Sequence, residues 1–269
     1  VQRINQENVE ATLNQIYREF LSKLGVTRKD VATLGSTGKK KPGGSSGDID
    51  LAISIKALTK KNKKVNTVDD VFDLIGETCR KNGYDFKDSR SLGVISLGFP
   101  ITNTDGKQDK ALVQLDFMPT EDLKYSSWSY HSPTEWESEW KGLYRNIVIF
   151  SIAKYVDFKV LKKMSDKEGK EVDVEWQRFF VDMRQGLMKG RQTRLSKAGN
   201  IVKTVRTTSK SAITRDPDEI IKFLFGPSWT AKDIMTWEQA LKAMTSSKFL
   251  HKKNLPRILK MVKDSLVNT

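Results

Sequence analysis

The 269-residue chain is expected to adopt an α+β fold, in which a small mixed sheet with helices precedes an all-helical C-terminal half. Apolar residues recur at three- and four-residue spacings over 9–24 and 68–79, as they do in amphipathic helices. Residues 48–55 alternate between polar and apolar, which is typical of a strand with one buried face. From Tyr144 onward the helical spacing predominates, so helices are expected to the C-terminus.

The N-terminal elements are marked by short local signals. Gly25 offers an end to the first helix, and a short apolar strand over 31–34 leads into Gly35 and Ser36. Residues 37–47 then contain four Gly, one Pro and three consecutive Lys. Neither a helix nor a strand is favoured by that composition, so we expect a loop.

The strand over 48–55 places Asp48 and Asp50 side by side on its polar face, because successive strand residues point to opposite faces. A lysine-rich loop is expected next, over 56–64. The second helix follows, and Thr67 is positioned to cap it, with an acidic residue three positions later.

Two further strands are expected over 92–101 and 111–118, joined by a turn-rich segment. In the second of these strands the apolar residues alternate with Gln114 and Asp116. The alternation predicts that Gln114 and Asp116 share the polar face of the sheet.

The C-terminal half is interpreted as helical, and the clearest helix start is Asp216, followed by Pro at the first helical position. Two domains are therefore expected: residues 1–143, with a core at 31–118, and residues 144–269, which include a basic segment at 184–215. The expected helices of the second domain cover 144–163, 173–190, 217–225, 231–244 and 255–267.

Composition narrows the possible functions. The chain has 47 basic and 33 acidic residues, a net charge of +14, which favours a polyanionic partner. One cysteine and two histidines argue against a disulfide framework, a cysteine-based zinc site and the common catalytic triads. No apolar run reaches the ~20 residues of a membrane helix, and no signal-peptide pattern is seen, so a cytoplasmic (intracellular) location is expected.

The carboxylates Asp48, Asp50 and Asp116 are the candidate catalytic and metal-binding residues. Two residues apart on a strand, the first two lie roughly 7 Å apart between Cα atoms. Three ionised carboxylates need cations to neutralise them, and hard ions such as Mg²⁺ suit oxygen donors. Two Mg²⁺ ions, or Mn²⁺, about 4 Å apart support phosphoryl or nucleotidyl transfer. The alternative is three solvated acids on an exposed sheet face.

The residues before the first carboxylate carry a longer motif. Leu34-Gly35-Ser36, an eleven-residue spacer and Asp48-Ile49-Asp50-Leu51 follow one another in the sequence. This pattern resembles the signature of the DNA polymerase beta-like nucleotidyltransferase superfamily, and the resemblance covers residues 31–118. It implies a nucleotidyltransferase-like sheet in the first domain.

The resemblance also implies a role for each residue of the motif. Gly35 and Ser36 would bind the triphosphate of a nucleotide, ATP or another. Asp48 and Asp50 would bridge two metal ions, and Asp116 would hold the metal that activates the attacking hydroxyl. The implied reaction is attack on the α-phosphorus of a nucleoside triphosphate, with pyrophosphate leaving.

A weaker resemblance lies in the apolar segment 144–155, which ends in Lys154 and an aromatic residue. Members of the superfamily similar to poly(A) polymerases and cyclic-nucleotide synthases often have such a helix after the sheet, and their lysine contacts the triphosphate. Lys154 is therefore a candidate nucleotide-binding residue. The alternative is a core helix whose lysine extends its charged end to solvent.

Positive charge gathers in the segment 184–215, which has nine basic residues and no acid. Hydroxyl and small residues fill the gaps, a composition that suits contacts with a phosphate backbone without base readout. The alternative is a flexible solvated loop. Its candidate nucleic-acid-binding residues are Lys189, Arg191, Arg194, Lys203, Arg206 and Lys210.

These observations favour a metal-dependent, template-independent nucleotidyltransferase that adds a nucleoside monophosphate to the end of a nucleic acid, RNA more than DNA. One alternative is an enzyme that makes a cyclic or short oligonucleotide, or that modifies a small molecule or protein. The net charge of +14 argues against it, since such acceptors do not require a basic protein. A second alternative is a non-catalytic nucleic-acid-binding module.

Overall fold

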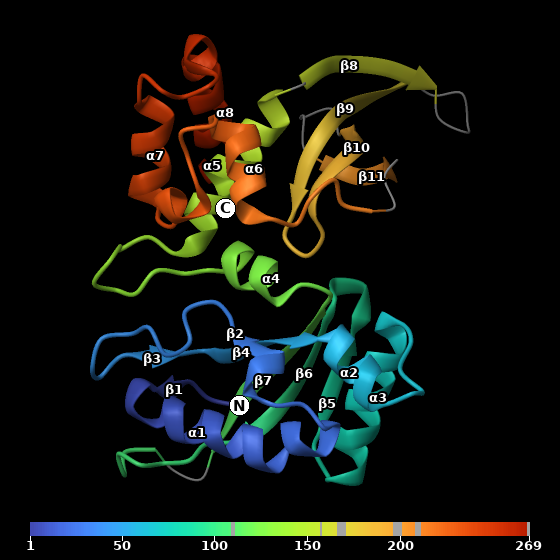
Figure 1. The fold of residues 1–269 in the computed structure, drawn as a ribbon, viewed down its shortest axis with the longest axis vertical. Coiled ribbons are helices and arrows are strands. Elements are labelled where there is room, and N and C mark those ends of the chain that lie inside the picture. Colours follow the sequence, from blue (N-terminus) through green and yellow to red (C-terminus); the bar gives the residue numbers. More distant parts are fainter. Residues whose placement is uncertain (109–110, 157, 166–170, 196–200, 208–210, 268–269) are drawn as a thin grey trace. The chain divides into compact units, whose positions relative to one another are not determined.

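The computed structural model describes residues 1–108, 111–156, 158–165, 171–195, 201–207 and 211–267 (Figure 1). By their internal contacts these residues form two compact units, Val1–Glu139 and Trp140–Thr269. None of the helices within the described ranges has the length and apolar character needed to cross a membrane.

A five-stranded mixed sheet is the centre of the first unit. Its central strands β4 and β7 run parallel, and every other neighbouring pair is antiparallel. The chain reaches β7 from β4 through two helices and two strands, the long connection that a parallel pair requires. In spatial order the strands are β2 (Val31–Thr33), β4 (Asp48–Ser54), β7 (Leu112–Thr120), β6 (Val94–Pro100) and β5 (Phe86–Ser89).

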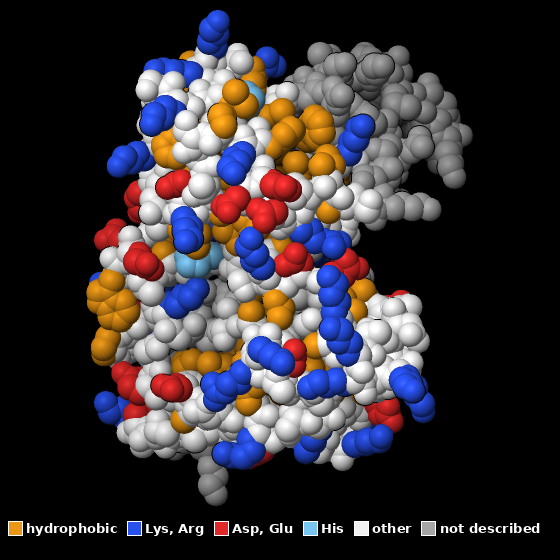
Figure 2. Space-filling view, in the orientation of Figure 1, with side chains coloured by type: hydrophobic (Ala, Val, Ile, Leu, Met, Phe, Trp, Pro, Cys, Tyr) orange, Lys and Arg blue, Asp and Glu red, His pale blue; other side chains and the backbone are white. Residues whose placement is uncertain are grey.

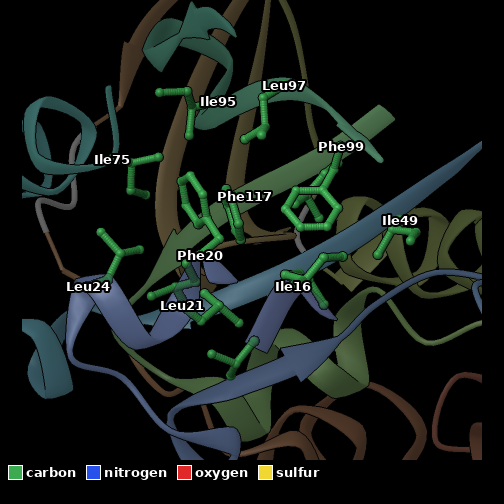
Figure 3. Packing of buried hydrophobic residues seen from close by; sticks show 14 of the residues in the cluster. Ile16, Phe20, Leu21, Leu24, Ile49, Ile75, Ile95, Leu97, Phe99 and Phe117 are labelled. Atoms are coloured by element: carbon green, nitrogen blue, oxygen red, sulfur yellow. The ribbon is translucent and has the colours of Figure 1, made fainter. Parts of the chain in front are cut away.

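The core of this unit lies between the apolar face of the sheet and two amphipathic helices (Figure 3). Phe20, just after the first helix, stacks on Phe117 of β7 with ring centroids 5.1 Å apart. Ile49 of β4 and Ile75 of the third helix are fully buried in the same cluster. The helices are α1 (Gln6–Glu19), α2 (Ile55–Lys61), α3 (Val68–Lys81) and α4 (Leu123–Ser129), and β1 (Ile4–Asn5) pairs with β3 (Ser45–Ser46).

Two local expectations have different outcomes here. The cap at Thr67 is confirmed, because its hydroxyl accepts from the Asp70 amide and the Asp70 carboxylate accepts from the Thr67 amide. The lysine-rich loop expected over 56–64 is wrong for residues 56–61, which belong to α2. The Ser54 side chain caps that helix, its residue Leu58 is fully buried, and lysine is itself a good helix former, so the lysine-rich composition is compatible with a helix.

The second unit combines helices with a separate antiparallel sheet of order β11-β10-β9-β8. The helices are α5 (Gly142–Val156), α6 (Pro217–Phe225), α7 (Trp237–Thr245) and α8 (Leu255–Val267). The strands are β8 (Phe158–Ser165), β9 (Glu171–Asp182), β10 (Gly186–Leu195) and β11 (Ile201–Thr207).

The α+β class is confirmed, but the expectation of an all-helical C-terminal half is wrong. The helix expected over 173–190 is replaced by β9 and β10, and the helix over 144–163 ends at Val156. The sequence of 171–177 alternates strictly between polar residues and Val or Trp, a strand pattern that outweighs the helical spacing we inferred. The helices over 217–225 and 255–267 have the expected bounds.

Candidate metal and nucleotide site

Three carboxylates converge on the polar face of the sheet. The parallel register of β4 and β7 pairs Asp50 with Asp116, and Asp48 precedes Asp50 by two residues on the same face. One oxygen of each of the three carboxylates lies within 4.8 Å of the others. Asp48, Asp50 and Asp116 therefore lie close enough together to bind a metal ion, as the alternating sequence pattern predicts.

The electrostatics of this cluster centre on Asp50. Burial, and then the negative charges of Asp48 and Asp116, raise the pKa of Asp50 from 3.8 to about 7. Without a cation, the group therefore retains a proton at pH values at which an exposed aspartate is ionised. A divalent cation is the natural replacement for that proton, and a set of carboxylate oxygens suits hard ions such as Mg²⁺ or Mn²⁺.

Gln114 holds the third carboxylate in place. It lies two residues before Asp116 on β7, and its side-chain amide donates to both carboxylate oxygens, at 3.1 and 3.0 Å. Its backbone pairs with Asp48 across the parallel strands. The alternating sequence pattern predicts that Gln114 lies on the polar face but assigns it no role. Its spacing of two residues from Asp116 on the same strand is the feature that could have indicated this contact.

Gly35 lies against the carboxylates at the end of β2. A Cβ at this position would be 2.9 Å from Oδ2 of Asp50, and the residue has a φ of +62°, so glycine is required on both grounds. The Leu34 amide donates to the Asp50 carbonyl at 2.9 Å, which fixes this turn to β4. The Gly35 amide donates to the Tyr130 carbonyl at 3.1 Å, so this amide is already hydrogen-bonded within the protein. The contacts of Gly35 and Ser36 with a triphosphate stay predictions.

The glycine-rich loop after Ser36 is held on one flank by the segment 132–135. Lys39 donates through Nζ to the Ser132 carbonyl at 2.7 Å, and the Glu135 amide donates to the Lys39 carbonyl at 3.2 Å. The Glu135 carboxylate accepts from the Lys41 amide at 3.0 Å and pairs with Nζ of Lys40 at 3.1 Å. No motif marked Glu135, because its partners lie more than ninety residues away in the sequence.

The start of α1 holds the other flank of the same loop. The Gln6 side-chain oxygen accepts from the Lys40 amide at 3.1 Å, and the Glu7 carboxylate accepts from the Gly43 amide at 2.7 Å. The backbone amide of Gln6 donates to the Gly44 carbonyl at 2.9 Å. Residues 37–47 thus form a loop as expected, apart from the short strand β3, and side chains from both flanks fix its path.

The remaining predicted residues belong to the second unit. Lys154 lies in the last turn of α5, half-buried, and its contact with a triphosphate stays a prediction. Lys189, Arg191 and Arg194 lie on β10, and Lys203 and Arg206 lie on the paired strand β11, with Arg194 opposite Lys203. These five residues are in strands, so the flexible-loop alternative does not hold for them. Lys210 lies outside the described residues.

Neither the protein-family models nor the curated proteins compared with this chain give a match. The likeness to the polymerase beta-like superfamily therefore rests on the motif of residues 34–51 and Asp116.

We expect Mg²⁺ or Mn²⁺ to stabilise the protein. Binding to the folded state alone adds about 2.7 kcal/mol at a metal concentration one hundred times the Kd, which corresponds to a rise of several degrees in Tm. Thermal unfolding with and without metal measures the rise. Asp116→Asn should abolish it, whereas Glu10→Gln, on the exposed face of α1, should retain it. An equal rise in both variants would place the metal elsewhere.

The pKa of Asp50 predicts how the stability of the metal-free protein depends on pH. A group whose pKa is higher in the folded state than in the unfolded state stabilises the fold below the unfolded value, and this contribution falls as pH rises through the folded value. For Asp50 the contribution is full below about pH 3.8 and is lost by about pH 7. Each pKa unit corresponds to about 1.4 kcal/mol.

Asp50→Asn removes this titration, since asparagine resembles the protonated acid. In chelator, the Asn variant should be as stable as the wild type near pH 4 and more stable at pH 8. Denaturant unfolding across this pH range gives the comparison, and parallel stability profiles for the two proteins would contradict it.

The contacts of Glu135 predict how readily trypsin cuts the loop. Glu135→Ala should speed cleavage after Lys39 and Lys40 two- to fivefold, since a partly exposed ion pair with its hydrogen bond contributes about 0.5–1 kcal/mol. Glu135→Gln keeps an acceptor for the Lys41 amide and should lie between. Limited proteolysis followed by mass spectrometry measures these rates. Glu139→Ala is the control, and an identical rate for it and Glu135→Ala would show that Glu135 does not hold the loop.

Proposed function

We propose that this chain is a metal-dependent nucleotidyltransferase. It would transfer a nucleoside monophosphate from a nucleoside triphosphate to the end of a nucleic acid without a template, RNA being favoured, and release pyrophosphate. The observation that carries the proposal is the cluster of Asp48, Asp50 and Asp116 on two parallel strands, with the Gly35 turn against it.

Each group of this cluster has a task in such a reaction. Asp48 and Asp50 would hold divalent metal ions together with Asp116, on the side of the sheet that Gly35 adjoins. When bound, Mg²⁺ or Mn²⁺ would supply neutralisation of the triphosphate charge and a lowered pKa of the attacking hydroxyl. Gln114 would keep the Asp116 carboxylate oriented toward that hydroxyl.

The loop would supply the triphosphate contacts. A Cβ at position 35 would lie 2.9 Å from Oδ2 of Asp50, so glycine leaves room beside the carboxylates for a phosphate. Ser36 would donate to the phosphates through its amide and hydroxyl. Because the loop is already fixed by Glu135 and Glu7, little ordering entropy is lost when the nucleotide binds.

The net charge of the protein supports a nucleic acid as the acceptor. A net charge of +14 suits a polyanionic acceptor, and neither a small molecule nor a protein requires it. A non-catalytic role is disfavoured by the position of Asp116, because its carboxylate lies close enough to those of Asp48 and Asp50 for the three to bind a metal ion.

Incubation with each labelled nucleoside triphosphate and metal, with and without a short single-stranded RNA or DNA, tests the proposal. The wild type should extend the oligonucleotide, and Asp50→Asn should lose at least about 100-fold in rate, because it removes a central metal ligand. Glu10→Gln should keep full activity.

Each of the other outcomes of this assay has a distinct interpretation. Small nucleotide products formed without the oligonucleotide would indicate a cyclic or short-oligonucleotide synthase. Full activity of Asp50→Asn would exclude the proposed mechanism, and absence of any product from the wild type would favour a binding module.

A further inference from the structure

The net positive charge of the protein comes from one of its two units. Residues 1–139 contain 20 basic and 20 acidic residues, whereas residues 140–269 contain 27 basic and 13 acidic residues. The whole surplus of 14 therefore lies in the second unit, and the unit with the three carboxylates is neutral. Figure 2 shows Lys and Arg side chains over the helices of the second unit.

Within the second unit the surplus is again localised. The segment 184–215 has nine basic residues and no acid, and the segment 246–269 has six basic residues and one acid. The rest of the unit has 12 basic and 12 acidic residues. The segment 246–269 therefore carries 5 of the 14 surplus charges, outside the basic segment 184–215.

The cations of this segment lie on α8 and on the turns that lead into it, and all of them are exposed. Ile258 and Val262 are buried on the inner face of the helix. At 100° per residue, Lys260 and Lys263 lie on the opposite face of α8, and positions three residues apart on a helix are about 5–6 Å from one another. Lys253 is exposed in the short 3-10 helix Lys252–Asn254 that precedes α8. Lys260 also pairs with Asp264 at 2.7 Å, the acid of this segment.

The backbone that carries these cations is held by packing and hydrogen bonding to other elements of the second unit. Phe249 is buried against Phe225 with ring centroids 5.7 Å apart, and the Leu250 amide donates to the Phe225 carbonyl at 2.9 Å. The Arg257 guanidinium lies over the ring of Tyr155 on α5, 5.9 Å from its centroid. Binding a polyanion here would need little reordering of the backbone.

We propose that the surface formed by this segment binds the phosphate backbone of a single-stranded nucleic acid, independently of sequence. We name it the C-terminal basic surface; assigning its ligand as the acceptor strand rests on the proposed transferase function. Exposed lysines and one arginine, with no aromatic side chain exposed among them, suit phosphate contacts and not base readout. Its residues are Lys248, Lys252, Lys253, Arg257, Lys260 and Lys263.

Binding of a fluorescent single-stranded oligoribonucleotide to the full chain, over a series of salt concentrations in chelator, tests the proposal. The assay uses the Asp50→Asn background, so its result does not depend on any catalytic activity. Changing Lys253, Lys260 and Lys263 to Gln should weaken binding about tenfold and reduce the slope of log K against log salt by about 2, or about 0.7 for each lost contact.

The matched control changes Lys29, Lys81 and Lys87 of the neutral unit to Gln. It removes the same charge, and Lys81 pairs with Glu77 at i,i+4 as Lys260 does with Asp264. The control should keep the affinity and slope of the parent protein. Equal losses in the two triple variants would show a net-charge effect and overturn the proposal.

Two further results would also overturn it. One is a folded triple variant, judged by circular dichroism and Tm, whose affinity and slope match those of the parent. The other is loss of binding to phosphatidylserine vesicles without loss of oligonucleotide binding, which would identify an anionic lipid surface as the ligand. Absence of RNA binding by the parent protein would exclude the surface, whether or not nucleotidyl transfer is found.

Discussion

The parallel pairing of β4 with β7 is the constraint on which the candidate site depends. It sets Asp50 opposite Asp116, and the apolar residues between the acids leave no other face for them. Ile49, Leu115 and Phe117 are fully buried, so a shift in register by one residue would bring carboxylates into the core. The hydrophobic core thus holds together three acids that repel one another.

This arrangement is unfavourable for the protein without a cation. Repulsion and burial act on Asp50 together, and a retained proton relieves them only in part. Neither Gln114 nor Gly35 neutralises the negative charge of the cluster. Gln114 donates hydrogen bonds to Asp116, and Gly35 leaves room beside Asp50. The carboxylates that could bind a cation therefore lower the stability of the metal-free protein, a trade-off that is common at functional sites.

The sequence predicted those parts in which local pattern and burial agree. Alternation placed Asp48, Asp50 and Asp116 on one face, and capping placed the helices that begin after Thr67 and Asp216. Prediction failed over 173–190, where strand alternation competed with helical spacing. The loop over 37–47 was predicted, but the contacts through which Glu135 fixes it could not be, because they join segments distant in the sequence and depend on tertiary structure alone.

The separation of charge between the units has a physical consequence for the proposed reaction. Fixed cations beside three carboxylates would neutralise them and compete with a divalent metal for the same oxygens. The first unit has equal numbers of acidic and basic residues, so it carries no net positive charge. The second unit, with a surplus of 14 positive charges, can attract a polyanion over about a Debye length, near 8 Å at physiological ionic strength. In the proposed reaction, metal binding and nucleic-acid attraction would make opposite electrostatic demands, and the net charges of the two units differ in the corresponding sense.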